Sequence, residues 1–507
     1  MNEKAIPESR KLLPRWLPFR VSAITGESHP LSSRQHSLES NHLQQLCALP
    51  KNSLTFGMAV DLLNSAVALG RPELGWPAVE VINAHEDFAS AELIQMRDQV
   101  LGKEHIVHPT FELNAGELTK RDAIRDARNH LRVNHRNPIA WIDLARAYTA
   151  VGSCEKALHC AEKALLLDSD SRFIVRSVAR LLIELKDTER AYSILRKSRL
   201  REVDPWIMAA ETSIAGLLGK TPASVKKSRV LASSQQISPF HLSELHAALG
   251  QLEHESGAGK NARKHFAQAL RSPTENSLAH VEFISHSFEN FRVNPTDFSV
   301  PFAFEASAWD CKEHEDWSNL VDYCRKWQRF EPYGTRPVNL GSNVASNRLN
   351  NHALAYSITQ EGLIASPGDA VLLNNSAYFL ALQGKTTEAD EIISALSGKS
   401  LSEATKACVT ATKGLILIRN GDLLAGRQCY IEAISIATNA GKVRLAFRAA
   451  SNLFIESETR NLPDKNESAH LFESLFAQAS EADIAEHKSK VGHLKDSQAK
   501  NRLNSLA

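Results

Sequence analysis

Apolar and small residues recur three or four positions apart along most of the chain, and short polar turns interrupt them. The stretch from Pro138 to Asp170 shows the pattern well, with large apolar residues at Trp141, Leu144, Tyr148 and Leu158 and small ones at Ala161 and Ala164. A similar arrangement follows about 34 residues later, at Val175, Val178, Ala179, Leu182, Ala191 and Leu195. This spacing predicts pairs of packed helices rather than strands.

Five turns share a glycine with a small residue seven positions before it and another five positions after it. The glycines are Gly152, Gly219, Gly257, Gly384 and Gly421, and every flanking residue is Ala, Gly, Ser or Thr. Glycine accepts the positive φ that ends a helix, and small side chains allow two helix backbones to approach closely. We therefore expect an all-α stack of helix–turn–helix hairpins.

The stretch from Pro138 to Asp170 resembles the tetratricopeptide repeat, a family of helical-repeat proteins. The residues that fall at the family's spacing are Trp141, Leu144, Ala145, Tyr148, Gly152, Ala157, Ala161 and Ala164, whereas Ser169 stands where the family usually has proline. The resemblance covers roughly Leu118 to Glu458, with irregular stretches. It implies a right-handed superhelical solenoid with a concave surface made largely by the first helix of each pair.

The same patterns divide the chain into four regions. They are a polar, proline-containing arm (1–52), an N-terminal cap of degenerate helical repeats (53–115), the tetratricopeptide-like solenoid (116–458), and a C-terminal capping helix with a charged tail (459–507). The periodicity breaks at 288–302 and again at 333–343. We expect the capping helix near 469–479 and a frayed or disordered tail from 486 onward.

Composition narrows the range of functions. The chain has 59 Lys and Arg against 58 Asp and Glu, so its formal charge of +1 shows no chain-wide affinity for polyanions. The seven cysteines are dispersed without a Cys-x-x-Cys pair, which is typical of reduced thiols in a cytoplasmic protein. No run of 18 apolar residues occurs, so we expect no membrane-spanning helix.

Three Gly-Lys stretches look like nucleotide-binding loops, at Gly219-Lys220, Gly259-Lys260 and Gly384-Lys385. Such a loop also needs a glycine five residues earlier and a preceding strand. Those earlier positions hold Ile214, His254 and Phe379, and each stretch follows a helical pattern. We therefore predict turns between helices and no bound nucleotide.

The motifs of catalysis and metal binding are also missing from the sequence. Neither His-Glu-x-x-His nor Gly-x-Ser-x-Gly occurs. Cys154, His159 and Cys160 lie close enough along the chain to ligate zinc, but packing and solvent-facing roles explain them better. We expect a protein that is not an enzyme, with no catalytic residue, metal or cofactor.

Three arginines are candidates for a ladder on the concave wall: Arg146, Arg176 and Arg180. Helix geometry turns Arg146 away from its packing face, and the other two lie one repeat later on one side of a helix. Their forked donors suit carboxylates or phosphates. The alternative is ordinary surface pairing with acids such as Asp143 and Glu184.

A second set of candidate partner-binding residues is rich in asparagine. It comprises Asn343, Asn347, Asn350, Asn374, Asn375 and Tyr378. Side-chain amides can bond the backbone of a bound peptide. The family resemblance implies this role for Asn375, but the lysines of the family's chaperone-tail clamp are missing. Helix-cap and turn roles stay open for some of these asparagines.

The stretch RKLLPRWLPFRV near the N-terminus combines basic and apolar residues, and its prolines exclude a long helix. Arg15, Trp16, Phe19 and Arg20 could dock on a partner or on an anionic surface. The segment could equally lie back along its own solenoid and bury Trp16.

Taken together, these features predict a cytoplasmic scaffold or adaptor that binds a peptide or helix of a partner protein in its concave groove. The first alternative is a subunit associated with nucleic acid, in which the arginine ladder and the basic arm contact phosphates. A second is a regulatory solenoid that senses a small ligand. The sequence indicates no membrane association and leaves the oligomeric state open.

Overall fold

The computed structural model describes residues 11–18, 46–50, 53–68, 72–89, 91–103, 120–133, 135–396, 398–460, 462 and 465–494. These residues belong to two compact units. Unit 1 extends to Asp310 and includes Phe330–Tyr333, and unit 2 comprises Cys311–Arg329 and the residues from Gly334 onward. The two units are described separately below.

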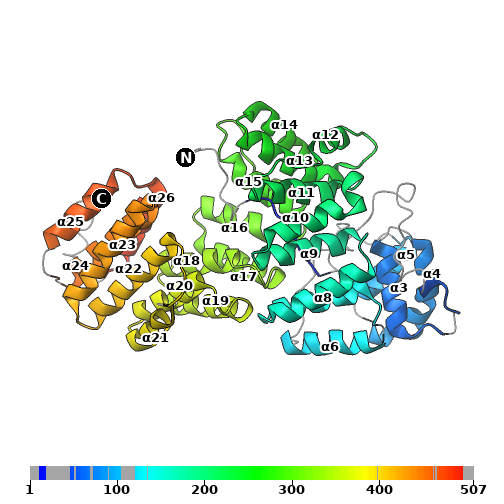
Figure 1. Cartoon of the computed structure of the whole chain (residues 1–507), viewed down its shortest axis with the longest axis horizontal. Coiled ribbons are helices and arrows are strands. Elements are labelled where there is room, and N and C mark those ends of the chain that lie inside the picture. Colours follow the sequence, from blue (N-terminus) through cyan, green and yellow to red (C-terminus); the bar gives the residue numbers. More distant parts are fainter. Residues whose placement is uncertain are drawn as a thin grey trace. The chain divides into compact units, whose positions relative to one another are not determined.

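Unit 1 is helical in all its regular elements within the described ranges (Figure 1). They are α3 (Phe56–Ala68), α4 (Pro72–Ala84), η3 (Glu86–Phe88), α5 (Ala91–Val100), α6 (Lys120–Val133), α7 (Pro138–Thr149), α8 (Cys154–Leu167), α9 (Arg172–Glu184), α10 (Thr188–Lys197), η4 (Arg199–Glu202), α11 (Pro205–Leu217), α12 (Val225–Ala232), α13 (Pro239–Glu255), α14 (Gly259–Ala269), α15 (Glu275–Ser285), η5 (Pro295–Asp297) and α16 (Phe304–Glu313), whose last turn crosses into unit 2.

Unit 2 continues the same kind of architecture. Its helices are α17 (Trp317–Phe330), α18 (Arg336–Asn347), α19 (His352–Ala365), α20 (Ala370–Leu382), α21 (Thr386–Leu396), α22 (Glu403–Arg419), α23 (Leu423–Asn439), α24 (Val443–Arg460), α25 (Lys465–Phe476) and α26 (Glu481–Gly492). Neighbouring helices pack in sequence, as α22, α23 and α24 show clearly in Figure 1. The all-α prediction is confirmed across the described residues.

The turn glycines confirm the predicted hairpins. Gly152, Gly219, Gly257, Gly384 and Gly421 all adopt positive φ, at 72°, 65°, 84°, 81° and 95°. Each follows a helix, namely α7, α11, α13, α20 and α22 in turn. Gly219-Lys220 and Gly384-Lys385 therefore lie in helix connections, and Gly259-Lys260 begins α14, each after a helix rather than a strand. Lys220 Nζ pairs with Glu189 at 2.6 Å.

The α22–α23 hairpin shows why small residues flank the turn. A Cβ on Gly414 would lie 2.8 Å from the carbonyl oxygen of Gly426, and a Cβ on Gly426 would lie 2.7 Å from that of Gly414. Real Cβ atoms do not approach backbone oxygens this closely, so both positions require glycine for the two helices to pack.

Each unit has its own apolar core. The largest core of unit 1 runs from α3 to α11 and contains Trp16, which comes from the arm. The core of unit 2 runs from α20 to the C-terminal helices and contains Tyr430, Phe447 and Phe472. Among the described residues, no helix is long and apolar enough to cross a membrane.

The predicted break at 333–343 is wrong, because α18 begins at Arg336. Pro337 lies in the first turn, where a helix loses no hydrogen bond to proline. Gly341 lies against α17, where a Cβ would be 2.9 Å from the Cβ of Cys324. Proline and glycine therefore start the helix and allow close packing here, rather than interrupting it.

The expected frayed or disordered tail is also wrong as far as residue 492. Helix α26 begins after Ser480, whose side chain accepts a hydrogen bond from the Asp483 amide. Glu486, His487 and Val491 are buried, so the helix packs into unit 2 despite its polar sequence. The predicted capping helix appears as α25, and residues 495–507 lie outside the described part.

Candidate binding sites in the two units

Residues 11–18, the arm segment, lie against unit 1 without forming a helix or strand. Side chains of unit 1 bind the backbone of the arm segment directly. The amide nitrogen of Leu12 donates to Gln251 Oε1 at 3.2 Å, and Asn276 Nδ2 donates to the carbonyl of Leu13 at 3.0 Å. The arm segment is therefore held partly through groups that every peptide carries.

The same backbone recognition continues at Trp16. Its carbonyl accepts hydrogen bonds from the Tyr333 hydroxyl at 3.0 Å and from Arg146 Nε at 3.3 Å. The seven side chains that bind the arm segment through its backbone or through Arg15 are named the arm site: Arg146, Gln251, Glu275, Asn276, Glu305, Glu331 and Tyr333.

Three apolar side chains of the arm segment enter three different clusters of unit 1. Leu12 joins a core formed by α11 to α15, and Leu17 packs with Phe330. Trp16 is completely buried, and its ring centroid lies 5.4 Å from that of Tyr333. Burying a tryptophan and two leucines removes considerable apolar surface from water, on the order of 2 kcal/mol for each residue.

Arg15 lies at the centre of three buried carboxylates. Its Nε is 3.0 Å from Glu275 Oε1, and its two terminal nitrogens donate to Glu305 and Glu331. Burial alone would lower the pKa of Arg15, but the combined attraction of Glu275, Glu331 and Glu305 raises it well above its ordinary value. The guanidinium therefore remains charged in the interior.

The candidate ladder arginines are engaged within unit 1. Arg176 pairs with Glu244 at 2.7 Å and stacks 4.6 Å above the Trp206 ring. Arg180 pairs with Glu184 at 2.7 Å, which is the local acid partner considered above, and lies 3.7 Å from Glu331. Both arginines are buried rather than presented on an open wall.

Arg146 differs from the other two because its hydrogen bonds go to backbone carbonyls, those of Trp16 and Phe330. Burial lowers the pKa of Arg146, although Tyr333, Asp143 and Glu331 oppose this effect. Of the four arm residues predicted to dock, Arg15 and Trp16 lie in the arm site. Phe19 and Arg20 lie outside the described residues.

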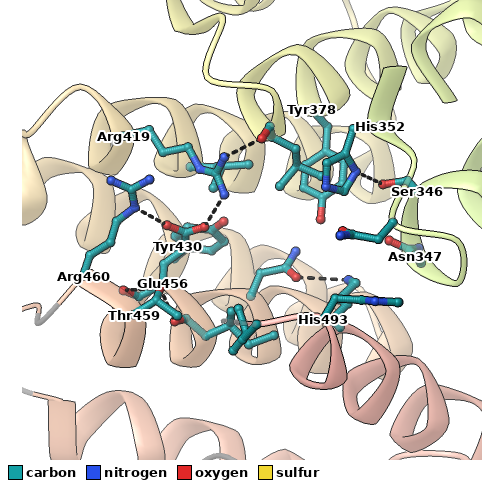
Figure 2. Close-up of a pocket in the computed structure, with 17 residues that line it drawn as sticks. Ser346, Asn347, His352, Tyr378, Arg419, Tyr430, Glu456, Thr459, Arg460 and His493 are labelled. Carbon is teal, nitrogen blue, oxygen red and sulfur yellow. Dashed lines mark hydrogen bonds and ion pairs between the residues drawn. The ribbon is translucent and has the colours of Figure 1, made fainter. Parts of the chain in front are cut away.

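The candidate asparagines belong to unit 2, where they help to line two adjoining cavities. The larger, with a volume of about 470 Å³, is named the unit 2 cavity (Figure 2). Its lining includes Ser346, Asn347, Asn350, His352, Tyr378, Arg419, Tyr430, Asn452, Glu456, Thr459, Arg460, Lys490 and His493. The smaller has a volume of about 110 Å³ and adds Asn343, Asn374 and Asn375.

Helix α26 is hydrogen-bonded to the C-terminal end of α18, beside the unit 2 cavity. Asn347 Nδ2 donates to Glu486 Oε1 at 3.2 Å, and its carbonyl accepts from the Ser489 hydroxyl at 3.0 Å. Arg348 donates to the carbonyl of Ala485 at 2.8 Å. These bonds, named the α18–α26 contact, connect residues about 140 positions apart along the chain.

Glu486 is the charged centre of this contact. Burial alone would raise its pKa, but Lys490 and Arg448 together lower it to about 2. Lys490 Nζ lies 3.1 Å from Glu486 Oε1, and Arg448 bonds the other carboxylate oxygen. The carboxylate is therefore ionised and fully engaged at neutral pH.

The unit 2 cavity carries an excess of positive charge. Its lining contains three cations, Arg419, Arg460 and Lys490, against the single carboxylate of Glu456. Both arginines lie 2.8 Å from oxygens of Glu456, as Figure 2 shows. Lys490 pairs with Glu486, so the excess positive charge comes from the two arginines that share Glu456.

His352 responds to this environment. Burial, followed by the positive charges of Arg419, His493 and Lys490, lowers the pKa of His352 to about 4. Its Nδ1 lies 3.1 Å from the Ser346 hydroxyl. The imidazole is therefore neutral at pH 7, and an anion beside it would raise its pKa.

The predicted asparagines differ in their hydrogen bonding. Asn343 donates to the carbonyl of Asn339, and Asn375 donates to the Asn339 side chain at 3.0 Å. Asn374 is 6% exposed, and its Oδ1 accepts no hydrogen bond although it lines the smaller cavity. A buried amide oxygen without a donor is costly, so Asn374 is an acceptor available to a bound group.

The pattern-based analysis missed most of these functional candidates. Gln251, Glu275, Asn276, Glu305 and Glu331 carry no motif, and the arm segment lies hundreds of positions from some of them. The one usable signal is the arm itself, where an arginine and a tryptophan adjoin inside an apolar stretch. Within the described residues, Cys154, His159 and Cys160 belong to no cluster of three possible metal ligands.

Several solved structures resemble the chain at low identity. Yeast Tom70 is 13% identical, with a TM-score of 0.29, and the match covers 76% of this chain and 92% of that one. The human IFIT1 dimer with PPP-AAAA is 13% identical, with a TM-score of 0.33 and coverage of 96% and 100%. The APC/C hetero-tetramer Cut9–Hcn1 is 11% identical, with a TM-score of 0.35 and coverage of 89% and 100%.

No protein-family model and no curated protein matches the sequence. At the identities and TM-scores above, no function is transferable from the solved structures, so the fold assignment depends on the hairpins themselves. The paired helices, their turn glycines and the small residues between them define the fold. Across the described residues, the chain is an all-α protein built from helix–turn–helix hairpins.

Proposed function

We propose that the chain is a non-catalytic interaction scaffold that binds a short segment of a partner protein in the unit 2 cavity. One observation carries this proposal, namely that the positively charged unit 2 cavity adjoins a smaller cavity lined by Asn374, whose buried side-chain oxygen accepts no hydrogen bond. A segment that presents an acidic side chain beside its backbone amides would satisfy both features.

The size of the cavity favours a short segment over a whole helix. Its volume of about 470 Å³ accommodates a few residues. An α-helix with its side chains is about 10–12 Å across and needs a longer, open groove. Exposed Thr459 and Arg460 lie at the lining, where a bound segment would continue into solvent.

A small anionic ligand is the second candidate. The cavity volume falls within the range of roughly 300–1,000 Å³ that is typical of small-molecule sites. The same cations would recognise its charge, which corresponds to the ligand-sensing alternative.

The nucleic-acid alternative has less support. It depends on Arg146, Arg176, Arg180 and the basic arm contacting phosphates. Arg176, Arg180 and Arg15 are instead paired with carboxylates inside unit 1. Phosphate contact through these groups would require breaking buried ion pairs, which costs several kcal/mol.

Site-directed photo-crosslinking in the native cell tests the proposal. A photoreactive amino acid at Thr459, on the rim of the cavity, should capture a partner protein that survives nuclease treatment. The same group at exposed Asn439, which is not among the lining residues, is the control. A captured species that is removed by nuclease would overturn the scaffold proposal in favour of nucleic acid.

A matched pair of substitutions then tests the role of charge. Arg460→Gln should weaken partner capture about tenfold, because a charged hydrogen bond contributes roughly 1.5–3 kcal/mol. Arg325→Gln, another partly exposed arginine in unit 2 with an acid partner, should leave capture unchanged. Equal capture by both variants would exclude recognition through the cavity cations. Detection of a co-purifying small anion by native mass spectrometry would favour the second candidate.

A further inference from the structure

The arm site has the chemistry of a peptide-binding site rather than that of an ordinary helix interface. Its side chains form hydrogen bonds with the backbone of Leu12, Leu13 and Trp16. These residues belong to the arm segment, which is not part of a helical hairpin. Side-chain amides that hold the backbone of a non-helical segment provide affinity, while pockets for alternate side chains provide specificity. Both parts are present here.

The three carboxylates of the arm site belong to unit 1 whether or not the arm segment is present. Glu275 lies at the start of α15, Glu305 lies in α16 and Glu331 follows α17. All three are buried, with Arg180 approaching one of them at 3.7 Å. Arg15 contacts all three carboxylates, so a segment that replaces the arm segment must present a cation at the same position.

The geometry specifies which cation fits. The carboxylates approach Arg15 at three different nitrogens, one at Nε and two at the terminal positions. A planar guanidinium presents donors in all these directions, whereas a lysine ammonium is a single point charge. Trp16, the residue after Arg15, packs against the ring of Tyr333, so the site also selects an aromatic side chain at that position.

We propose that the arm site is a binding site for peptide segments with an Arg-Trp-Leu core, and that residues 11–18 occupy it as the chain's own ligand. A partner protein that presents a non-helical segment of the same chemistry competes for the arm site and displaces the arm segment. Because the arm segment is covalently attached, its local concentration is high, and a free competitor must overcome this advantage. This inference concerns unit 1 and is independent of the unit 2 cavity.

The experiment keeps the full chain and cuts only its connection to the arm. A protease site is inserted between residues 21 and 45, outside the described ranges, and the folded protein is then cleaved. Binding of a fluorescently labelled peptide of residues 9–20 is measured by anisotropy. The cleaved protein should exchange its arm for the labelled peptide, and the uncleaved protein should bind it at least about 100-fold more weakly.

Peptide variants test the chemistry of recognition. Arg15→Ala should weaken binding at least about 100-fold, because a buried charge partner is lost, and Arg15→Lys should not restore it. Trp16→Ala should weaken binding comparably. A minimal peptide that keeps only Leu12, Arg15, Trp16, Leu17 and the prolines should bind within about tenfold of the native one, because few contacts carry most of the affinity.

Each contrary result has a clear meaning. If the cleaved protein unfolds, or retains its arm without exchange, the segment is a structural part of unit 1 and the proposal is wrong. Equal binding of the Arg15→Ala peptide would also overturn it. A concentration-dependent dimer of the uncleaved chain would show that a second copy, rather than a partner segment, supplies the competing arm.

Discussion

The arm site and the unit 2 cavity are both lined by charged side chains, but their balance of charge is opposite. Three buried carboxylates gather in the arm site, and an arginine from the chain itself compensates them. In the unit 2 cavity, cations outnumber the single acid, and in the smaller cavity beside it the buried amide oxygen of Asn374 has no donor. The arm site is occupied by a segment of the chain itself, whereas the cavities of unit 2 present cations and an acceptor on their walls.

This difference cannot be inferred from residue types alone. Arg176 and Arg180 look like part of an exposed ladder in the sequence, yet each has an acid partner in the structure. Four tests of this comparison follow, beginning with the largest expected effect.

Arg15→Glu should have the strongest effect, because it places a fourth carboxylate among Glu275, Glu305 and Glu331. Removing one partner of a buried ion pair costs about 3–5 kcal/mol, and reversing its charge should exceed that range. The free energy of unfolding, measured with urea, reports the loss. Arg190→Glu is the matched control, because its pair with Glu162 is exposed on both sides and should contribute at most about 1 kcal/mol. Similar losses in both variants would contradict the buried cluster.

Trp16→Ala should destabilise unit 1 by about 3–5 kcal/mol, because it leaves a cavity where a fully buried ring packs against Tyr333. Trp76→Ala, at a side chain that is 61% exposed, should change stability by less than about 0.5 kcal/mol. Thermal unfolding of the two variants provides the measurement. An unaffected melting temperature for Trp16→Ala would mean that the arm segment is not seated in solution.

Acid should lower the free energy of unfolding of unit 2 in two successive steps, one for His352 and one for Glu486. The folded pKa of His352 is about 4, below its ordinary 6.5, so stability falls as pH drops from 6.5 toward 4. The folded pKa of Glu486 is about 2, below its ordinary 4.5, so its contribution is present above pH 4.5 and is lost as pH falls toward 2. That second contribution is on the order of 3 kcal/mol.

Hydrogen exchange of α26 between pH 7 and pH 3 measures the loss. Glu486→Gln should destabilise the helix at pH 7 and remove the loss of stability between pH 4.5 and pH 2. His352→Gln should remove the loss between pH 6.5 and pH 4. If the loss between pH 6.5 and pH 4 persists in His352→Gln, another group must be responsible for it.

Alanine at the turn glycines should have the smallest effect, and an equal one in both units. Gly219 and Gly384 have positive φ and open space around the missing Cβ, so alanine costs only backbone strain of about 1–2 kcal/mol. Gly368→Ala, at a position with open space and ordinary φ, is the control and should be nearly neutral. Equal costs in unit 1 and unit 2 would confirm that the hairpins are equivalent and that the units differ in what they bind.

Local patterns were sufficient to predict much of the fold. Helix periodicity and the spacing of small residues around Gly152, Gly384 and Gly421 depend on contacts between neighbouring helices, which a linear pattern encodes. The same reasoning failed at α18, where proline and glycine were interpreted as breaks. Position decides their effect, because proline is tolerated in a first turn and Gly341 allows close approach to α17.

The sites were less predictable because long-range contacts form them. Arg15 meets Glu305 and Glu331 across 290 and 316 positions, and no periodicity relates these residues. Asn374, predicted to bind a partner, lines the smaller cavity, but its unpaired oxygen depends on where every neighbouring donor points. Helix α26 is polar in sequence, and pairing of Glu486 with Lys490 and Arg448 is what permits its burial.

The α18–α26 contact changes how unit 2 should come apart. A linear stack of repeats has free ends, and hairpins can peel from them one at a time because each contacts only its neighbours. Here α26, the last helix of the described residues, is bonded back to α18 near the start of the unit, so it cannot peel away without breaking these bonds. Unit 2 should consequently resist gradual unravelling and lose its structure in one cooperative step once the contact breaks.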